Sequence, residues 1–176
     1  PPPARTEAMQ HIVSTQIQHA CRETWNFTSA ELADELRRLQ LRQPHLVQLV
    51  TDECDVYGAK TTDLGIHMVY LIWRLFDERA SAQLHRVTVQ HATRDYERSV
   101  DILFNLSGVN ERLVERLLDP RTSGHPDLML FIEDMLYDYR DGESKPLSDG
   151  ELGVMIALAR TFIELLDHAS RAPVSD

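Results

Sequence analysis

The sequence is poor in residues that turn or cross-link a chain. Its 176 residues include 7 glycines, 8 prolines and 2 cysteines. So little glycine and proline leaves few places for the tight turns between strands, and no alternation of apolar and polar residues typical of strands is present. Cys21 and Cys54 form neither a disulfide framework nor a CxxC or zinc-binding spacing. We therefore predict an all-α fold in a reducing, cytoplasmic compartment, with both cysteines as small buried hydrophobic residues.

Positive charge and long hydrophobic runs are also scarce. The chain has 18 basic and 28 acidic residues, which gives a formal net charge of -10. This charge would repel nucleic acid and anionic lipid over most of the surface. No stretch reaches the roughly 18 uncharged apolar residues that a transmembrane helix requires. The composition argues against a nucleic-acid-binding or membrane protein, and we expect no cofactor because no cofactor-binding motif is present.

Apolar residues recur at spacings of three and four along most of the chain, as in amphipathic helices. We predict a single domain over 1–176, with flexible tails at 1–5 and 171–176. It would contain about seven helices, arranged as a multi-helical bundle or a short α-solenoid-like stack. Two capping boxes, Thr28 with Glu31 and Ser148 with Glu151, mark helix starts. Further helices are expected at 6–24, from Pro44 to a stop at Gly58, at 110–118 and at 126–139.

The segment 61–106 contains one glycine, Gly65, and no proline, so it forms either one very long helix or two helices. We expect two, with a joint near residues 80–84, because the pattern changes there. Residues 64–76 are apolar on nearly every side, whereas residues 89–103 carry one narrow apolar stripe on a charged helix. The first of the two is therefore the best candidate for a central, buried helix.

Residues 97–120 contain a pattern found in known helical repeats. The run SVDILFNLS from Ser99 to Ser107 is followed by Asn110 and by apolar residues at 113, 114, 117 and 118. It resembles the second-to-third-helix region of an armadillo or HEAT-type repeat, although no clear copy occurs at the period of about 40–47 residues that such repeats have. The resemblance implies a stack of helices that binds other proteins, with no catalytic residues to carry over.

Histidine beside carboxylate is the first place to look for metal or acid–base chemistry. The metal-binding spacings His-Glu-x-x-His and Glu-x-x-His are both absent. One group differs from ordinary surface pairs because it follows one side of the apolar helix at 64–76: Asp63, His67, Arg74 and Glu78. A charge on a buried helix must be paired or reach water. Three interpretations stay open, namely a solvent edge with ordinary ion pairs, a buried structural network, and a polar pocket for a ligand.

Acidic residues gather between 127 and 151, where eight of them stand against Arg140 and Lys145. A calcium loop of the EF-hand type starting at Asp138 would place Arg140 at its third ligand position. A start at Asp141 would place Lys145 at the fifth, so no metal is expected. The segment is either a solvated acidic face or a docking surface for a basic protein. The residues predicted to bind that partner are Glu133, Asp134, Asp138, Asp141 and Glu143.

Signatures of catalysis are missing, since neither a nucleophile motif nor a phosphate-binding glycine loop occurs. The sequence therefore favours a non-enzymatic interaction domain, an adaptor, scaffold or regulatory protein with an acidic surface. The alternative is a small helical enzyme or ligand-binding protein with a polar pocket around His67 and Arg74, where Asp63 would orient the imidazole. A homodimer, in which a second copy covers the apolar residues 66–76, is a third possibility.

Overall fold

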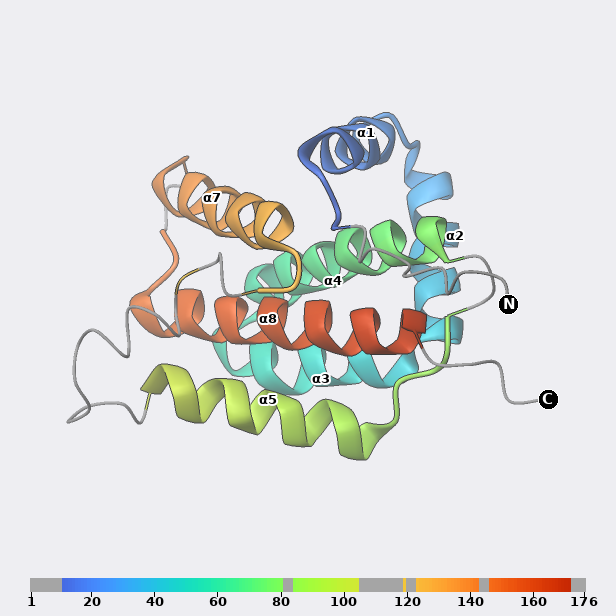
Figure 1. The fold of residues 1–176 in the computed structure, drawn as a ribbon. Helices are drawn as coiled ribbons and strands as arrows, with labels where there is room; N and C mark the ends of the chain where they lie inside the picture. Colours follow the sequence, from blue (N-terminus) through green and yellow to red (C-terminus); the bar gives the residue numbers. More distant parts are fainter. Residues whose placement is uncertain (1–10, 81–83, 105–118, 120–122, 143–145, 172–176) are drawn as a thin grey trace, which may run out of the picture.

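The computed structural model describes residues 11–80, 84–104, 119, 123–142 and 146–171 (Figure 1). No strand occurs among them, so the all-α prediction is confirmed, with seven α-helices in this part of the chain. None of these helices has the length and apolar character of a membrane span. In chain order the elements are α1 (Ser14–Trp25), α2 (Ser29–Arg42), α3 (Pro44–Cys54), the 3-10 turn η1 (Asp55–Tyr57), α4 (Ala59–Arg79), α5 (Val89–Phe104), α7 (Pro126–Gly142) and α8 (Asp149–Arg171).

Both predicted capping boxes are confirmed. At the start of α2 the Thr28 hydroxyl accepts the Glu31 N–H at 3.3 Å, and the Glu31 carboxylate accepts the Thr28 N–H at 2.7 Å. Ser148 and Glu151 repeat this exchange at the start of α8, at 3.2 and 2.7 Å. Gly58 ends η1 with a φ of 104°, a value that favours glycine. These signals are readable from sequence because a cap is completed within one turn of chain.

The first helix begins later than its apolar pattern predicts. Residues 11–13 are not helical and α1 starts at Ser14, so the predicted start near residue 6 is wrong here, while residues 6–10 lie outside the described residues. The Ile12 N–H donates to Nδ1 of His125 at 3.0 Å, and the Ser14 N–H donates to Asp127 at 3.2 Å. Long-range partners thus take the amides that a longer helix would have used internally.

Two helices, not one, occupy the long segment 61–106, as predicted. α4 ends at Arg79 and α5 begins at Val89. The chain between them is fixed to the α2–α3 corner by Gln43, which is buried. The Gln43 side chain accepts the Val87 N–H at 2.9 Å and donates to the His85 carbonyl at 2.9 Å. A buried amide with both of its polar groups paired holds this connection in one place.

α4 and α8 form the centre of the fold; α3 packs on α4, and α5 and α7 pack on α8 (Figure 1). Ten of the 21 residues of α4 and ten of the 23 residues of α8 are buried, so the predicted central helix is confirmed. Gly65 permits a close approach of α3, since a Cβ there would lie 2.7 Å from Val50 Cγ1. Cys54 is fully buried as predicted, Cys21 is partly buried, and both are free thiols.

Some sequence predictions lie outside the described residues. They include the helix at 110–118 and most of the segment that resembles an armadillo or HEAT-type repeat, of which only residues 97–104 belong to the C-terminal part of α5. The predicted tails also fall there, except for Arg171. This residue ends α8 and forms an ion pair with Asp167, one turn earlier.

Candidate functional site

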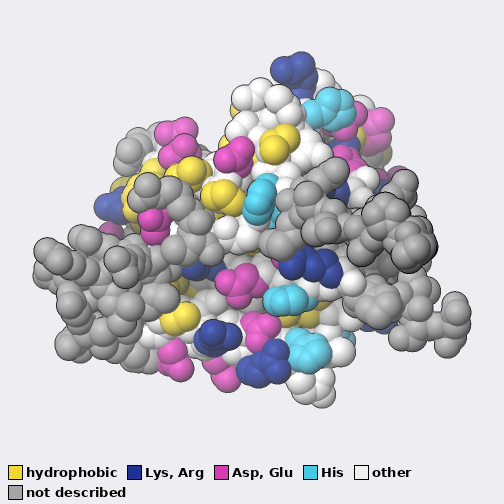
Figure 2. All heavy atoms as spheres, in the orientation of Figure 1, with side chains coloured by type: hydrophobic (Ala, Val, Ile, Leu, Met, Phe, Trp, Pro, Cys, Tyr) yellow, Lys and Arg dark blue, Asp and Glu magenta, His cyan; other side chains and the backbone are white. Residues whose placement is uncertain are grey.

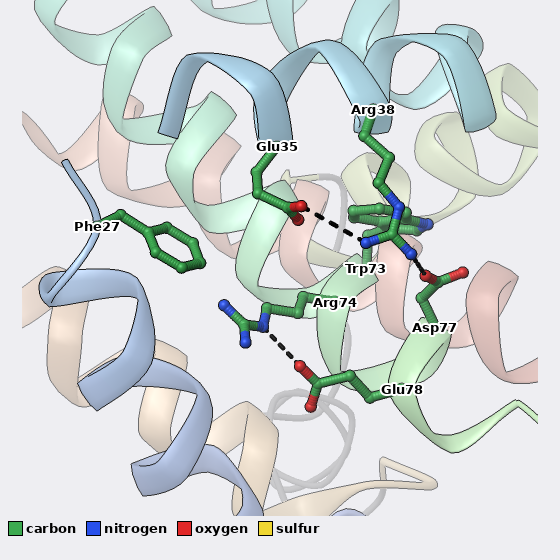
Figure 3. A pocket seen from close by; sticks show the side chains of 7 residues that line it. All are labelled: Phe27, Glu35, Arg38, Trp73, Arg74, Asp77 and Glu78. Carbon is green, nitrogen blue, oxygen red and sulfur yellow. Dashed lines mark hydrogen bonds and ion pairs between the residues drawn. The ribbon is translucent and has the colours of Figure 1, made fainter. Parts of the chain in front are cut away.

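The polar stripe predicted on α4 divides into two parts. Asp63 and His67 are exposed, and His67 Nδ1 lies 2.7 Å from the carbonyl oxygen of Asp63 in the same helix. Arg74 and Glu78, further along α4, line a cavity between α4 and α2 that is also bordered by Phe27 of the loop between α1 and α2 (Figure 3). The stripe therefore contributes two of its four residues to this cavity, and His67 is not among them.

Arg74 is largely enclosed, with 13% of its side chain exposed. Its Nε donates to Glu78 Oε1 at 2.6 Å, and its Nη2 donates to Glu23 Oε2. The guanidinium also lies over the Phe27 ring, 5.2 Å from the ring centroid, in a cation–π contact. Burial alone would lower the pKa of Arg74, but the hydrogen bond to Glu78 and the electrostatic effect of Tyr70 and Glu78 outweigh it and raise this pKa. Arg74 is thus a fixed positive charge whose in-plane donors are directed at carboxylates.

Arg38 on α2 makes a matching arrangement at the other side of the cavity (Figure 3). Its Nη2 donates to Asp77 Oδ2 at 2.6 Å, and its Nη1 lies 3.5 Å from Glu35 Oε1. Its guanidinium carbon lies 5.3 Å from the centroid of the Trp73 ring. Each arginine of the cavity is therefore paired with two carboxylates and stacked on one aromatic ring.

Tyr70 connects the two arginine clusters. Its hydroxyl donates to Glu35 Oε2 at 3.1 Å and accepts from Arg74 Nη1 at 3.4 Å. Burial, the main cause, raises the pKa of this phenol to about 12, so it stays protonated near neutral pH. Sequence reasoning missed Tyr70 and Glu35, because they are 35 residues apart and only the packing of α2 on α4 brings them together.

The cavity has a volume of about 220 Å³. A second cavity, of about 360 Å³, lies between α1 and α4 and shares Glu78 with the first. With Glu23 included, four carboxylates surround two guanidinium groups, so the site carries excess negative charge in a partly enclosed volume, which favours cations. The first cavity is lined by Phe27, Glu35, Arg38, Trp73, Arg74, Asp77 and Glu78.

Of the five acids predicted to bind a partner, the structure describes the side chains of three, Glu133, Asp134 and Asp138. Asp134 and Asp138 are exposed on α7. Glu133 is half-buried instead; burial raises its pKa, and the positive charge of Arg160 opposes that change. The side chain of Asp141 and the whole of Glu143 lie outside the described residues. Two of the five are therefore placed where a partner could reach them.

The same side of α7 also exposes apolar side chains. Leu130 is 43% exposed and Tyr137 is 47% exposed. Together with Asp134 and Asp138 they fall at positions i, i+4, i+7 and i+8, which share one face of a helix; we call these four residues the α7 face. Figure 2 shows hydrophobic side chains over α7 with acidic side chains beside them. Sequence reasoning placed Tyr137 close to Asp134 and Asp138 but missed Leu130, although the spacing of seven between Leu130 and Tyr137, outside the inward stripe, was a usable signal.

His125 is a further residue that sequence reasoning missed. It is 4% exposed; its Nδ1 accepts the Ile12 N–H at 3.0 Å, and its Nε2 donates to Asp167 Oδ1 at 3.1 Å. The Phe76 ring meets it edge to face at a centroid distance of 5.0 Å. Because the fold uses both ring nitrogens, His125 joins the start of α1 to α8 and is not arranged as a catalytic base. Its partners are 113 and 42 residues away, so no local spacing marks it.

Neither a metal-binding group in the described residues nor a related protein of known function indicates what this protein does. No group of three or more His, Cys, Asp or Glu residues able to hold a metal is found in the described ranges. Comparison with protein-family models, with curated proteins and with solved structures finds no match. The cavity at Arg74 and the α7 face are the two features from which a function can be argued.

Proposed function

We propose that the protein is a non-enzymatic interaction module, of the adaptor, scaffold or regulatory kind, that binds a partner protein through the α7 face. The observation that carries this proposal is that exposed Leu130 and Tyr137 share one helical face with exposed Asp134 and Asp138. Tyrosine is enriched at interfaces because it offers apolar area with a polar end. The carboxylates beside it would set the orientation and the choice of partner.

The partner is expected to be basic where it meets the α7 face. The chain as a whole carries a formal charge of -10, so association with a basic surface is favoured at long range as well as at contact. Exposed charges are screened over roughly 10 Å at 0.1 M salt. Binding should therefore weaken as salt is raised, mainly through a slower association rate.

The test is affinity capture from native lysate with two variants of the α7 face, one of which changes charge and one of which removes apolar area, and with a charge-matched control elsewhere. Asp134→Lys with Asp138→Lys should lose the partner that the unaltered protein retains, and Leu130→Asn with Tyr137→Asn should lose it at low salt. Glu97→Lys with Glu164→Lys makes the same charge change at exposed positions of α5 and α8 and should retain it. A partner that both α7 variants still hold would contradict the proposal.

The cavity at Arg74 and Glu78 supports the second candidate function, a small ligand-binding protein or enzyme. The specific observation in its favour is a partly enclosed volume of about 220 Å³ bordered by charged side chains that are held in place by one another. The exposed position of His67 gives no support to an imidazole base there. Trp25→Phe removes one of the two tryptophans and leaves Trp73 in the cavity wall, so this function expects a small molecule to change Trp73 emission.

The structure gives no support to self-association through the apolar residues 66–76, so the homodimer stays a proposal. Residues 68–73, 75 and 76 are buried by helices of the same chain. No second copy is needed to cover them. Analytical ultracentrifugation that gives a monomer at micromolar concentration would exclude the homodimer.

A further inference from the structure

We infer that the cavity between α2 and α4 binds a small organic cation, an ammonium or guanidinium compound. The inference rests on the second candidate function, because it names the ligand class of that cavity. It is independent of the α7 face, since no residue of α7 lines this cavity. Three properties of the site lead to it: the saturation of its arginines, the excess of its carboxylates, and its size and aromatic walls.

The arginines of the cavity are poorly suited to an anionic ligand. Arg74 directs Nε at Glu78 and Nη2 at Glu23, and its Nη1 meets Tyr70. Arg38 is paired with Asp77 at 2.6 Å and with Glu35 at 3.5 Å. An anion would have to displace a carboxylate that already makes a charge-assisted hydrogen bond, and such bonds are about twice as strong as neutral ones.

The carboxylates, by contrast, have acceptor capacity to offer. The bonds to arginine use Oδ2 of Asp77 and Oε1 of Glu78, so Oδ1 and Oε2 are the oxygens that a ligand would meet. Asp77 has 14% of its side chain exposed, which reduces screening of its charge by water. An ammonium or guanidinium group would partly neutralise the two negative charges that exceed the positive ones in this site, and it would donate to these oxygens.

The walls and the volume restrict the ligand further. Phe27 and Trp73 each have a guanidinium group of the protein over the ring, so the aromatic walls of this site already lie against cations. A volume of about 220 Å³ is below the roughly 300–1,000 Å³ of pockets for drug-sized ligands. The ligand is thus a compound of a few heavy atoms, such as a short aliphatic amine.

The test compares three linear four-carbon compounds that differ only in their end groups: butane-1,4-diamine, butane-1,4-diol and succinate. The Trp25→Phe protein is titrated with each at constant ionic strength, and Trp73 emission and calorimetry are recorded. We expect the diamine alone to bind. Asp77→Asn with Glu78→Gln should weaken that binding about tenfold, since two charges at the site are removed. Glu97→Gln with Glu164→Gln, the same charge change at exposed positions elsewhere, should leave it unchanged.

Each other outcome has a definite meaning. Binding of the diol or of succinate in place of the diamine would overturn the inference on ligand class and leave the cavity as a ligand site. Equal weakening by the two double variants would show diffuse attraction to an acidic protein and would also overturn it. No response of Trp73 to any of the three compounds would remove both the inference and the second candidate function. Circular dichroism and thermal unfolding of the Asp77 and Glu78 variant establish that a loss of binding is not a loss of fold.

Discussion

The centre of the molecule and its edge at α1 are held together by different forces. α4 and α8 each bury ten residues, whereas α1 buries only Ile17 and Ala20. α1 depends instead on polar links, among them Glu23 to Arg74 and Ile12 to His125. Both cavities described above lie against α1 or the loop that follows it. The open, polar volume of this fold thus lies beside α1 and α2, which bury few residues and are linked to α4 by ion pairs and hydrogen bonds.

The largest effect is expected from a methyl group added to the centre. Gly65→Ala should lower the free energy of unfolding by about 1–3 kcal/mol, the usual cost of overpacking, because the new Cβ would lie 2.7 Å from Val50 Cγ1. Gly150→Ala is the matched control, since its nearest atom is the Tyr57 hydroxyl at 3.4 Å. Urea unfolding measures both variants. If the two variants were equally stable, α3 would have to move to accept the methyl group. The contact between α3 and α4 would then be less tightly packed than we describe.

A smaller and local effect is expected at the edge. His125→Ala removes the acceptor of the Ile12 N–H and the donor to Asp167, and each lost hydrogen bond should cost about 1 kcal/mol. Hydrogen exchange should quicken in α1 while the amides in the middle of α8 keep their protection. His67→Ala, at an exposed position, should change neither. Faster exchange throughout the protein after His125→Ala would show that α1 and the centre open as one unit.

Acid should weaken the same edge through Asp167. Burial raises the pKa of this carboxyl, but hydrogen bonds from His125 and Arg171 outweigh burial and lower the pKa below 3.8. A lowered folded-state pKa means that Asp167 stabilises the fold above about pH 3.8 and loses this contribution as the pH falls through the folded value. Asp167→Asn should therefore flatten the dependence of stability on pH in the acid range below pH 4. An unchanged acid profile would contradict the role given to this residue.

The smallest effect is expected for the reactivity of the two thiols, Cys21 in α1 and Cys54 in α3, the helix that packs on α4. Burial and the charge of Glu53 raise the pKa of Cys54 in α3 to about 11, and burial also raises the pKa of Cys21 in α1. Cys21 is only partly buried, so it should be alkylated first at pH 8, with the single variants Cys21→Ser and Cys54→Ser used to assign the rates. If the Cys54 thiol is alkylated as quickly as the Cys21 thiol, burial does not protect Cys54 from the reagent, and the expected difference between the two thiols is wrong.

The local features of the fold could be predicted well, whereas the candidate site could be predicted only in part. Caps at Thr28 and Ser148 and the stop at Gly58 are completed by neighbouring residues, so they follow from spacing alone. The start of α1 could not be predicted, because the amide of Ile12 is taken by His125, 113 residues away. The apolar spacing correctly indicated that Ile12 is buried, but it could not indicate whether Ile12 lies in a helix.

The residues alone imply an all-helical chain, a central apolar helix at α4 and a strongly negative charge, since helix periodicity and charge are properties of short segments or of simple sums. The packing of the helices determined instead which charges meet. It paired Arg74 with Glu23, 51 residues away, and Arg38 with Asp77, 39 residues away, while it left His67 at the surface. The physical reason is that a cavity is made by the faces of different helices, and their mutual rotation is set by the packing of the core and not by the spacing of the residues that line it.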